Sequence, residues 1–125
     1  MGTAPHLNDN RAALLARIAA APSLFCGLDY DGTLAPLAPT PDDARPLPGT
    51  DALLHRLAAR RGTRIAIVTG RAIANVQRFL DLDRAYYIGI HGLEIRRPGE
   101  PIDYSSAGRA ARAILPTLVN RLRAQ

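Results

Sequence analysis

The feature that most constrains the fold of this chain is a short apolar run that ends in two carboxylates. Residues Ser23–Asp29 (SLFCGLD) are followed closely by Asp31, Gly32 and Thr33. An apolar run of this length, stopped by acidic residues and a glycine, is typical of a buried strand in the centre of a sheet. We therefore expect a sheet built around this strand, with Asp29 and Asp31 at its carboxyl end.

The rest of the sequence alternates between helical and extended patterns. Helical spacing of apolar residues covers about 8–20, 50–61 and 72–80, and buried strands are indicated at 64–68 and 85–90. A proline-dense connection covers 36–48, a hairpin turning at Pro98-Gly99 covers 93–104, and a last helix covers 105–125, which Pro116 is expected to kink or divide. This alternation predicts an α/β fold with a doubly wound, Rossmann-like parallel sheet.

Polar residues follow each of the three predicted parallel strands. Asp29 and Asp31 come after the first strand, Thr69 after the second and His91 after the third. Ligands of open parallel sheets bind beyond the carboxyl ends of the strands. The sequence therefore predicts a site at the edge where these side chains meet.

Asp29 and Asp31 are the main candidates for catalysis. They lie two positions apart where an extended segment ends, so both side chains can point to one side. Two carboxylates about 4 Å apart repel by roughly 4 kcal/mol at an effective dielectric constant of about 20, and a divalent cation or a proton relieves this repulsion. One carboxylate is thus suited to nucleophilic attack on a phosphate ester and the other to proton transfer. The alternative is a plain acidic turn, because Asp-Gly is a common turn dipeptide.

Two segments offer donors for a phosphate group. Gly32 and Thr33 form a flexible loop whose N–H groups can turn toward phosphate oxygens. Thr69, Gly70 and Arg71 follow a strand and open a predicted helix, where a hydroxyl and free N–H groups can bind an anion. In the alternative interpretation Thr69 only caps that helix and Arg71 is a solvated side chain.

His91 and Glu94 complete the set of candidate substrate contacts. They belong to the segment His-Gly-Leu-Glu that follows the third predicted strand. A histidine at a strand end is often a hydrogen-bonded structural residue, and Glu94 can either orient its neighbours or contact polar groups of a substrate.

Charge and composition exclude several other classes of protein. The net charge is +5, yet the 16 basic residues are all arginines spread along the chain, with no alternation of basic and aromatic residues. We therefore expect no nucleic-acid binding; a positive field also attracts a small phosphorylated substrate. The single cysteine, Cys26, is typical of a reducing compartment, and Arg17 and Pro22 interrupt the longest apolar stretch, so a cytoplasmic protein without a membrane segment is expected.

Three segments resemble one known family. The residues LDYDGTLAPLAPTPDDARPLPG (28–49), IAIVTGR (65–71) and YYIGIHGLEIR (86–96) are similar to the trehalose-6-phosphate phosphatases of the haloacid dehalogenase (HAD) superfamily. The resemblance implies that Asp29 is the nucleophile that becomes phosphorylated, and that Asp31 is the general acid and later the base. It also implies Mg²⁺ bound by the Asp29 carboxylate and the Asp31 main-chain carbonyl, Thr69 in contact with the phosphoryl group, and a sugar phosphate, trehalose 6-phosphate, as substrate.

The sequence also departs from this family. Its members use a third-motif lysine and a fourth, acidic motif, whereas this chain contains no lysine and its last acidic residue is Asp103. We therefore expect residues 1–97 to form the N-terminal part of a HAD-like catalytic core and residues 98–125 the start of a truncated cap domain, with doubtful activity for the chain alone. The alternatives are a phosphatase for another sugar phosphate and an inactive fragment or binding module. The oligomeric state does not follow from the sequence.

Overall fold

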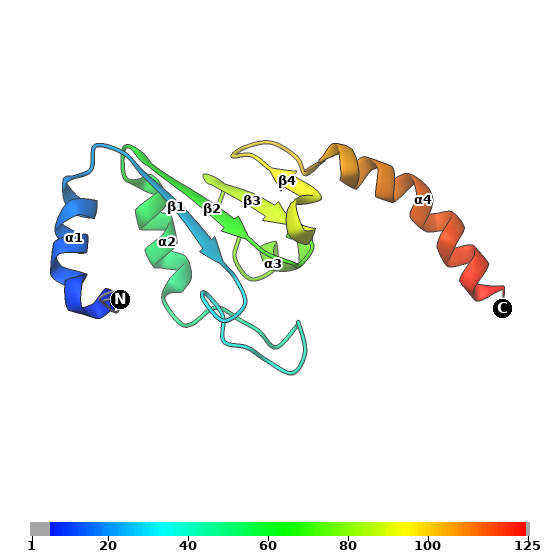
Figure 1. Ribbon diagram of the computed structural model, residues 1–125, viewed down its shortest axis with the longest axis horizontal. Helices are drawn as coiled ribbons and strands as arrows, with labels where there is room; N and C mark the ends of the chain where they lie inside the picture. The colour runs from blue at the N-terminus through cyan, green and yellow to red at the C-terminus, as the bar shows by residue number, and fades with distance from the viewer. Residues whose placement is uncertain (1–5, 125) are drawn as a thin grey trace, which may run out of the picture.

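The structure is a computed structural model that describes residues 6–124. Figure 1 shows a central sheet with α2 and α3 beside it, α1 at one end and α4 extending from the other. The helices are η1 (Leu7–Asn10), α1 (Arg11–Ala20), α2 (Thr50–Ala59), α3 (Ile73–Gln77), η2 (Ile90–Gly92) and α4 (Ser106–Arg123). The strands are β1 (Leu24–Asp29), β2 (Thr63–Val68), β3 (Ala85–Gly89), β4 (Glu94–Arg96) and β5 (Asp103–Tyr104).

The sheet has the order β1-β2-β3-β4-β5, and its first three strands are parallel. Strands β4 and β5 add to β3 in antiparallel fashion and form the predicted hairpin, whose turn contains Gly99 at φ 74°. Because β1, β2 and β3 are linked through α2 and α3, the predicted α/β fold is confirmed. The boundary predicted between residues 97 and 98 lies inside this hairpin and stays a prediction.

One face of the sheet carries the core of the protein. Side chains of β2 and β3 on this face, among them Ile65, Ile67 and Tyr87, are fully buried against Leu54 of α2 and Ile73 of α3. Their alternation follows from the two-residue period of a strand, which places every second side chain on the same face. This packing fixes the ends of β1 and β2 relative to the start of α3, where the candidate site lies.

Strand β1 differs from the buried central strand that the sequence predicts. In the described residues it lies at an edge of the sheet, its residues alternate between half-buried and exposed, and Phe25 is 66% exposed. Among the described residues β1 has a neighbouring strand on one side only, and on the second face of the sheet Val68 is 42% exposed and no residue of α1 is buried. An apolar run has the same appearance in sequence whether one or both of its faces are covered.

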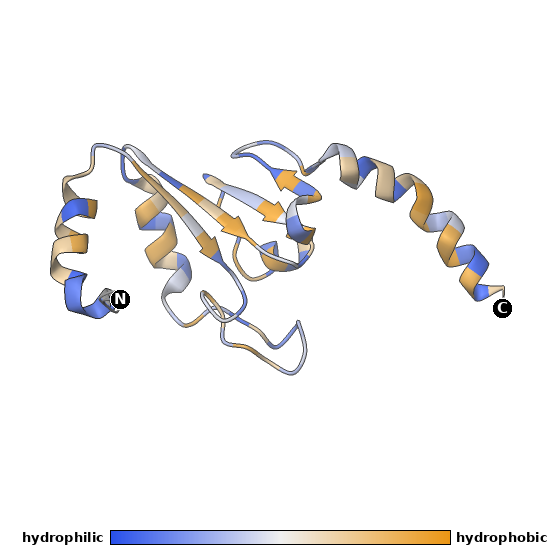
Figure 2. Cartoon of the chain, viewed as in Figure 1, coloured by the Kyte–Doolittle hydropathy of each residue, from blue (hydrophilic) through white to orange (hydrophobic). Residues whose placement is uncertain are grey.

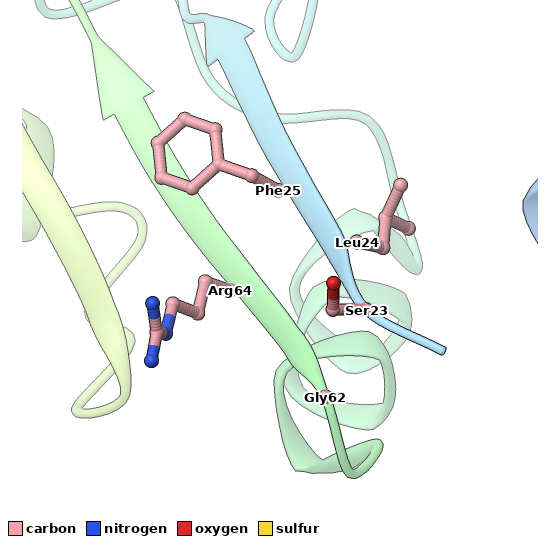
Figure 3. Close-up of a pocket in the computed structure, with 5 residues that line it drawn as sticks. All are labelled: Ser23, Leu24, Phe25, Gly62 and Arg64. Atoms are coloured by element: carbon pink, nitrogen blue, oxygen red, sulfur yellow. The ribbon is translucent and has the colours of Figure 1, made fainter. Parts of the chain in front are cut away.

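The open face of the sheet contains a hollow at the amino ends of β1 and β2 (Figure 3). It is lined by Ser23, Leu24, Phe25, Gly62 and Arg64. Because Asp29 lies at the opposite end of β1, this hollow is separate from the candidate site.

The terminal helices also differ from their predicted form. The predicted helix at 8–20 is a 3₁₀ turn capped by His6 followed by α1, and Asn10 at the start of α1 makes no side-chain capping bond. Helix α4 passes through Pro116 undivided. Pro116 removes the donor for the Arg112 carbonyl, but the residues around it are exposed, so water can satisfy that carbonyl. Figure 2 shows hydrophobic residues recurring along α4 as well as along β2.

We expect Tyr87 to make the stability of the protein fall steeply above pH 10. Its hydroxyl donates to the Leu80 carbonyl (2.7 Å) and accepts from the Leu82 N–H (2.9 Å). Burial raises the pKa of Tyr87 to about 12 from an ordinary value of 10.0. The unfolded chain therefore loses this proton first, and stability present below pH 10 is lost as pH rises toward 12, by about 2–3 kcal/mol.

Urea unfolding at about pH 9 and about pH 11.5 checks this expectation. Tyr87→Phe should be less stable at the lower pH, because two buried hydrogen bonds are lost, but its stability should fall less at the higher pH. Tyr86→Phe, on the opposite face of the same strand, is the matched control and should retain the steep fall. An equal fall in wild type and Tyr87→Phe would contradict the assignment.

Candidate active site

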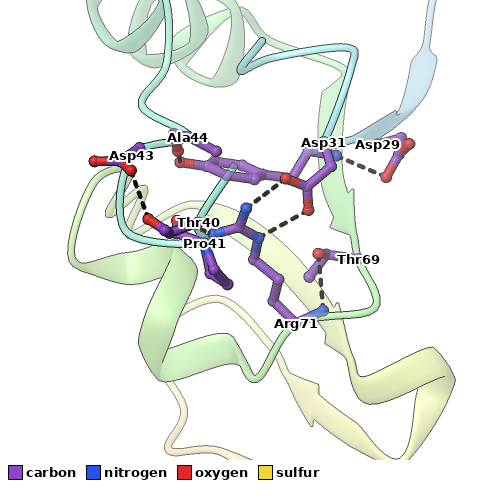
Figure 4. A network of polar contacts seen from close by, with 9 residues as sticks. Asp29, Asp31, Thr40, Pro41, Asp43, Ala44, Thr69 and Arg71 are labelled. Carbon is purple, nitrogen blue, oxygen red and sulfur yellow. Dashed lines mark hydrogen bonds and ion pairs between the residues drawn. The ribbon is translucent and has the colours of Figure 1, made fainter. Parts of the chain in front are cut away.

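The candidate site lies at the carboxyl ends of the three parallel strands. The register pairs Asp29 of β1 with Val68 of β2, and Val68 with Ile88 of β3. The three strands therefore end side by side, with Asp31, Thr69 and His91 in the segments that follow them. Figure 4 shows Asp29, Asp31, Thr69 and Arg71 close to one another in this region.

Asp29 begins a tight turn in which most main-chain N–H groups donate to acceptors within the turn itself. The Tyr30 N–H donates to Asp29 Oδ1 (2.8 Å), and the side chain of Asp29 is exposed. The Gly32 N–H donates to the Ala35 carbonyl (2.7 Å) and the Thr33 N–H to the Tyr30 carbonyl (3.4 Å). We expected the last two N–H groups to face a phosphate, but the structure places both inside the turn, which Gly32 closes at φ 79°.

Asp31 forms a two-point ion pair with Arg71. Arg71 Nε donates to Asp31 Oδ2 (2.8 Å) and Nη2 to Oδ1 (2.5 Å), while Nη1 donates to the Pro41 carbonyl. The guanidinium also lies over the Tyr30 ring, 5.2 Å from its centroid. The hydrogen bond to Asp31 raises the pKa of Arg71. Arg71 therefore supplies a positive charge that pairs directly with Asp31, a contact that the sequence did not reveal.

The Thr69-Gly70-Arg71 turn is not the start of a helix. Thr69 is buried and its Oγ1 accepts from the Arg71 N–H (3.1 Å), whereas α3 begins later, at Ile73, after the N-cap residue Ala72. The expectation of helical N–H groups in this turn is thus corrected: the Ile73 N–H is bonded to Glu94. The hydroxyl of Thr69 and the exposed Gly70 are the parts of the turn that remain candidates for contact with a phosphate.

His91 and Glu94 approach this turn from different sides. His91 is exposed and its ring lies against Gly70, since a Cβ added to Gly70 would be 2.8 Å from His91 Cε1. Glu94 is only 8% exposed, and its Oε2 accepts from the Ile73 N–H (2.8 Å). Of the predicted site residues, His91 therefore lies at the accessible surface of the turn, and Glu94 supports it from within the protein.

The proline-dense connection contributes to the site in a way that sequence reasoning missed. The Tyr30 hydroxyl donates to the Ala44 carbonyl (2.8 Å), and the Pro41 carbonyl accepts from Arg71. Burial raises the pKa of Tyr30, which keeps this donor protonated. The sequence did contain a signal for this contact: Tyr30 is an aromatic residue between two aspartates, and it precedes the rigid proline-dense segment.

The residues present fit a magnesium ion only as a partial site. Within residues 6–124, no group of three or more His, Cys, Asp or Glu side chains gathers in a way that could hold a metal. Asp29 offers one exposed carboxylate, and the Asp31 carboxylate is engaged by Arg71, which leaves its main-chain carbonyl. Mg²⁺ is commonly bound through one or two carboxylates, with water and substrate phosphate as its other ligands, so this donor set is compatible with it.

Fold and site together define an α/β protein with a mostly parallel sheet and two aspartates, Asp29 and Asp31, at the carboxyl end of its first parallel strand. The family model of trehalose-phosphatase matches residues 27–121. The chain belongs to the trehalose-phosphatase family, as its sequence motifs predict.

Curated relatives and solved structures agree with this assignment. The trehalose-phosphate phosphatase of Mycolicibacterium paratuberculosis is 36% identical over 102 residues, which is 82% of this chain and 25% of that protein. The enzyme of the same name from Mycobacterium tuberculosis is 35% identical over 108 residues, covering 86% of this chain and 27% of that protein. The chain thus spans about a quarter of the length of these relatives.

Among solved structures, a trehalose-6-phosphate phosphatase related protein is 30% identical with a TM-score of 0.67, over 81% of this chain and 42% of that one. Trehalose-6-phosphate phosphatase of Aspergillus fumigatus is 26% identical with a TM-score of 0.70, over 89% of this chain and 44% of that one.

Across the described residues, none of the helices is both long enough and apolar enough to span a membrane.

Proposed function

We propose that this protein takes part in the hydrolysis of trehalose 6-phosphate to trehalose and phosphate, through an aspartyl-phosphate on Asp29. The observation that carries the proposal is the placement of Asp29, exposed and at the end of β1, beside an Asp31 held by Arg71 from the Thr69 turn. Membership of the trehalose-phosphatase family supports the substrate class.

In the first step, a carboxylate oxygen of Asp29 bonds to phosphorus while the bond between phosphorus and the sugar oxygen breaks. Asp31 gives its proton to the leaving sugar oxygen. In the second step, water attacks the phosphorus, Asp31 accepts a proton from that water, and the bond to Asp29 breaks to release phosphate. A bound Mg²⁺, held by the Asp29 carboxylate and the Asp31 carbonyl, would offset the negative charge of the phosphate.

Arg71 has two successive roles in this scheme. Its two hydrogen bonds occupy both carboxylate oxygens of Asp31, so neither oxygen is free for the first proton transfer. A phosphate dianion competes for the same guanidinium, because arginine binds phosphate and carboxylate through the same pair of donors. Transfer of Arg71 to the phosphate would leave Asp31 free to take up a proton.

The remaining site residues would bind the substrate. The Thr69 hydroxyl and the Gly70 N–H would contact the phosphoryl group, with the Gly32-Thr33 turn as the opposite wall of the site. The exposed His91 ring, which lies against Gly70, would contact polar groups of the sugar. Glu94 would support these residues without touching the substrate.

We also retain the expectation of a cytoplasmic location.

A chimera provides the direct test of this function. Residues of this chain would replace the matched segment of the Mycobacterium tuberculosis relative, since the match covers 27% of that protein. We expect the chimera to release phosphate from trehalose 6-phosphate with Mg²⁺, and chelation of the metal to lower the rate roughly 100-fold or more. The parent relative and the 125-residue chain are assayed in parallel.

A folded chimera that releases no phosphate from trehalose 6-phosphate would overturn the proposal. Equal or faster turnover of sucrose phosphate or a mannosyl phosphate would reassign the substrate within the same class. A rate that chelation leaves unchanged would remove Mg²⁺ from the scheme.

A further inference from the structure

The segment after β3 holds the Thr69–Ile73 stretch at three points. The Ile90 N–H donates to the Arg71 carbonyl (2.9 Å), and the His91 N–H donates to the Thr69 carbonyl (3.4 Å). The third point is a side chain: Glu94 Oε2 accepts from the Ile73 N–H (2.8 Å). The turn that carries Arg71 is therefore bonded at its first residue, in its middle and at its end.

Glu94 is the unusual member of this set because it is a carboxylate with almost no access to water. It is 8% exposed, and none of the ion pairs found among residues 6–124 includes it. Burying an unpaired charge is unfavourable unless a hydrogen bond compensates, and a bond from an N–H to a carboxylate is among the stronger ones. Its described partner is a single main-chain N–H, so its position depends on that bond.

Close backbone packing makes the three bonds act as a rigid unit. A Cβ added to Gly89 would lie 2.7 Å from Ile73 Cγ1 and 2.9 Å from the Arg71 carbonyl oxygen. Ile90 and His91 adopt left-handed backbone angles, at φ 46° and φ 53°. A β-branched residue such as Ile90 enters this region only when its surroundings enforce it. The turn therefore has little freedom to shift relative to β3.

We infer that Glu94 is a positioning residue that fixes the end of the turn from which Arg71 reaches Asp31. Arg71 lies two residues before Ile73, and its guanidinium makes two hydrogen bonds with Asp31. Releasing the Ile73 N–H frees that end of the turn, and a two-point pair tolerates little displacement. The catalytic meaning of this role rests on the proposed function, whereas the geometric role stands without it.

The Arg71 side-chain Nε–H reports directly on this role, because it donates to Asp31 Oδ2. Its nitrogen–proton NMR signal and hydrogen exchange would be measured in the 125-residue chain, together with exchange of the Arg71 and Ile90 amides. We expect Glu94→Leu to accelerate exchange of the Arg71 Nε–H at least about tenfold. Glu94→Gln keeps a side-chain oxygen at the same reach and should retain slow exchange.

Two further variants separate positioning from general loss of stability. Leu54→Ala removes core packing on α2, away from the turn, and should leave the Arg71 signal in place. Glu94→Asp keeps the charge but shortens the side chain, so it should accelerate exchange of the Arg71 Nε–H as Glu94→Leu does, and it replaces Glu94→Leu in the test if that variant does not fold. Unchanged exchange of the Arg71 Nε–H in Glu94→Asp or Glu94→Leu, or an equal acceleration in Leu54→Ala, would overturn the inference. No substrate is used, so this result is independent of the chimera assay.

Discussion

Replacing Asp29 by asparagine is expected to lower phosphate release by the chimera at least about a thousandfold. Asparagine has nearly the same shape, but its amide oxygen carries no full negative charge and is a poor nucleophile toward phosphorus. The Tyr30 N–H can still donate to that oxygen, so the turn should keep its shape. Release of phosphate from trehalose 6-phosphate gives the rate, and the mass of the acid-quenched protein shows whether a phosphoryl group is bound.

Asp51→Asn is the matched control for this variant. Asp51 is an exposed carboxylate on α2 that pairs with His55 at 3.4 Å, outside the site, and its replacement should leave the rate unchanged. The phosphorylated species should be detectable in the active chimera and missing from Asp29→Asn. Near-normal turnover by Asp29→Asn would exclude Asp29 as the nucleophile, whichever sugar phosphate is used.

Replacing Gly89 by valine is expected to destabilise the 125-residue chain by about 3 kcal/mol or more. Gly89 is buried at the end of β3, and a Cβ there would lie 2.7 Å from Ile73 Cγ1 and 2.9 Å from the Arg71 carbonyl oxygen. One of these neighbours is backbone, so the strain can be relieved only by moving the Thr69–Ile73 stretch away from β3. Urea unfolding gives the change in the free energy of unfolding.

Gly27→Val is the matched control, since Gly27 lies in β1 with no atom within 4 Å of an added Cβ. Valine is favourable in strands, and we expect a change of no more than about 0.5 kcal/mol. Unfolding of Gly89→Val at the same urea concentration as wild type would mean that β3 and the start of α3 are not in the close contact described. The Arg71 Nε–H signal gives a second reading, because a displaced turn should also lose the pair with Asp31.

Local patterns in the sequence were sufficient to predict the parallel strands and the edge of the sheet at which the candidate residues gather. The apolar run before Asp29, the run before Thr69 and the run before His91 are β1, β2 and β3, and their linkage by helices makes them parallel. Parallel strands end at a common edge. Three strands followed by polar residues therefore place those residues together, without knowledge of any side-chain conformation.

The exposure of β1, the Arg71–Asp31 pair and the buried role of Glu94 were decided only by the tertiary structure. Asp31 and Arg71 are 40 positions apart, and their meeting depends on the path of the proline-dense segment and on the conformation of a long side chain. In the sequence, Glu94 looks like a residue that contacts substrate, because it is acidic and follows a strand. In the structure it is buried and accepts a hydrogen bond from the Ile73 N–H, which gives it a structural role. Strand and helix patterns arise from interactions between near neighbours in the chain, whereas these features depend on which distant groups packing brings within hydrogen-bond distance.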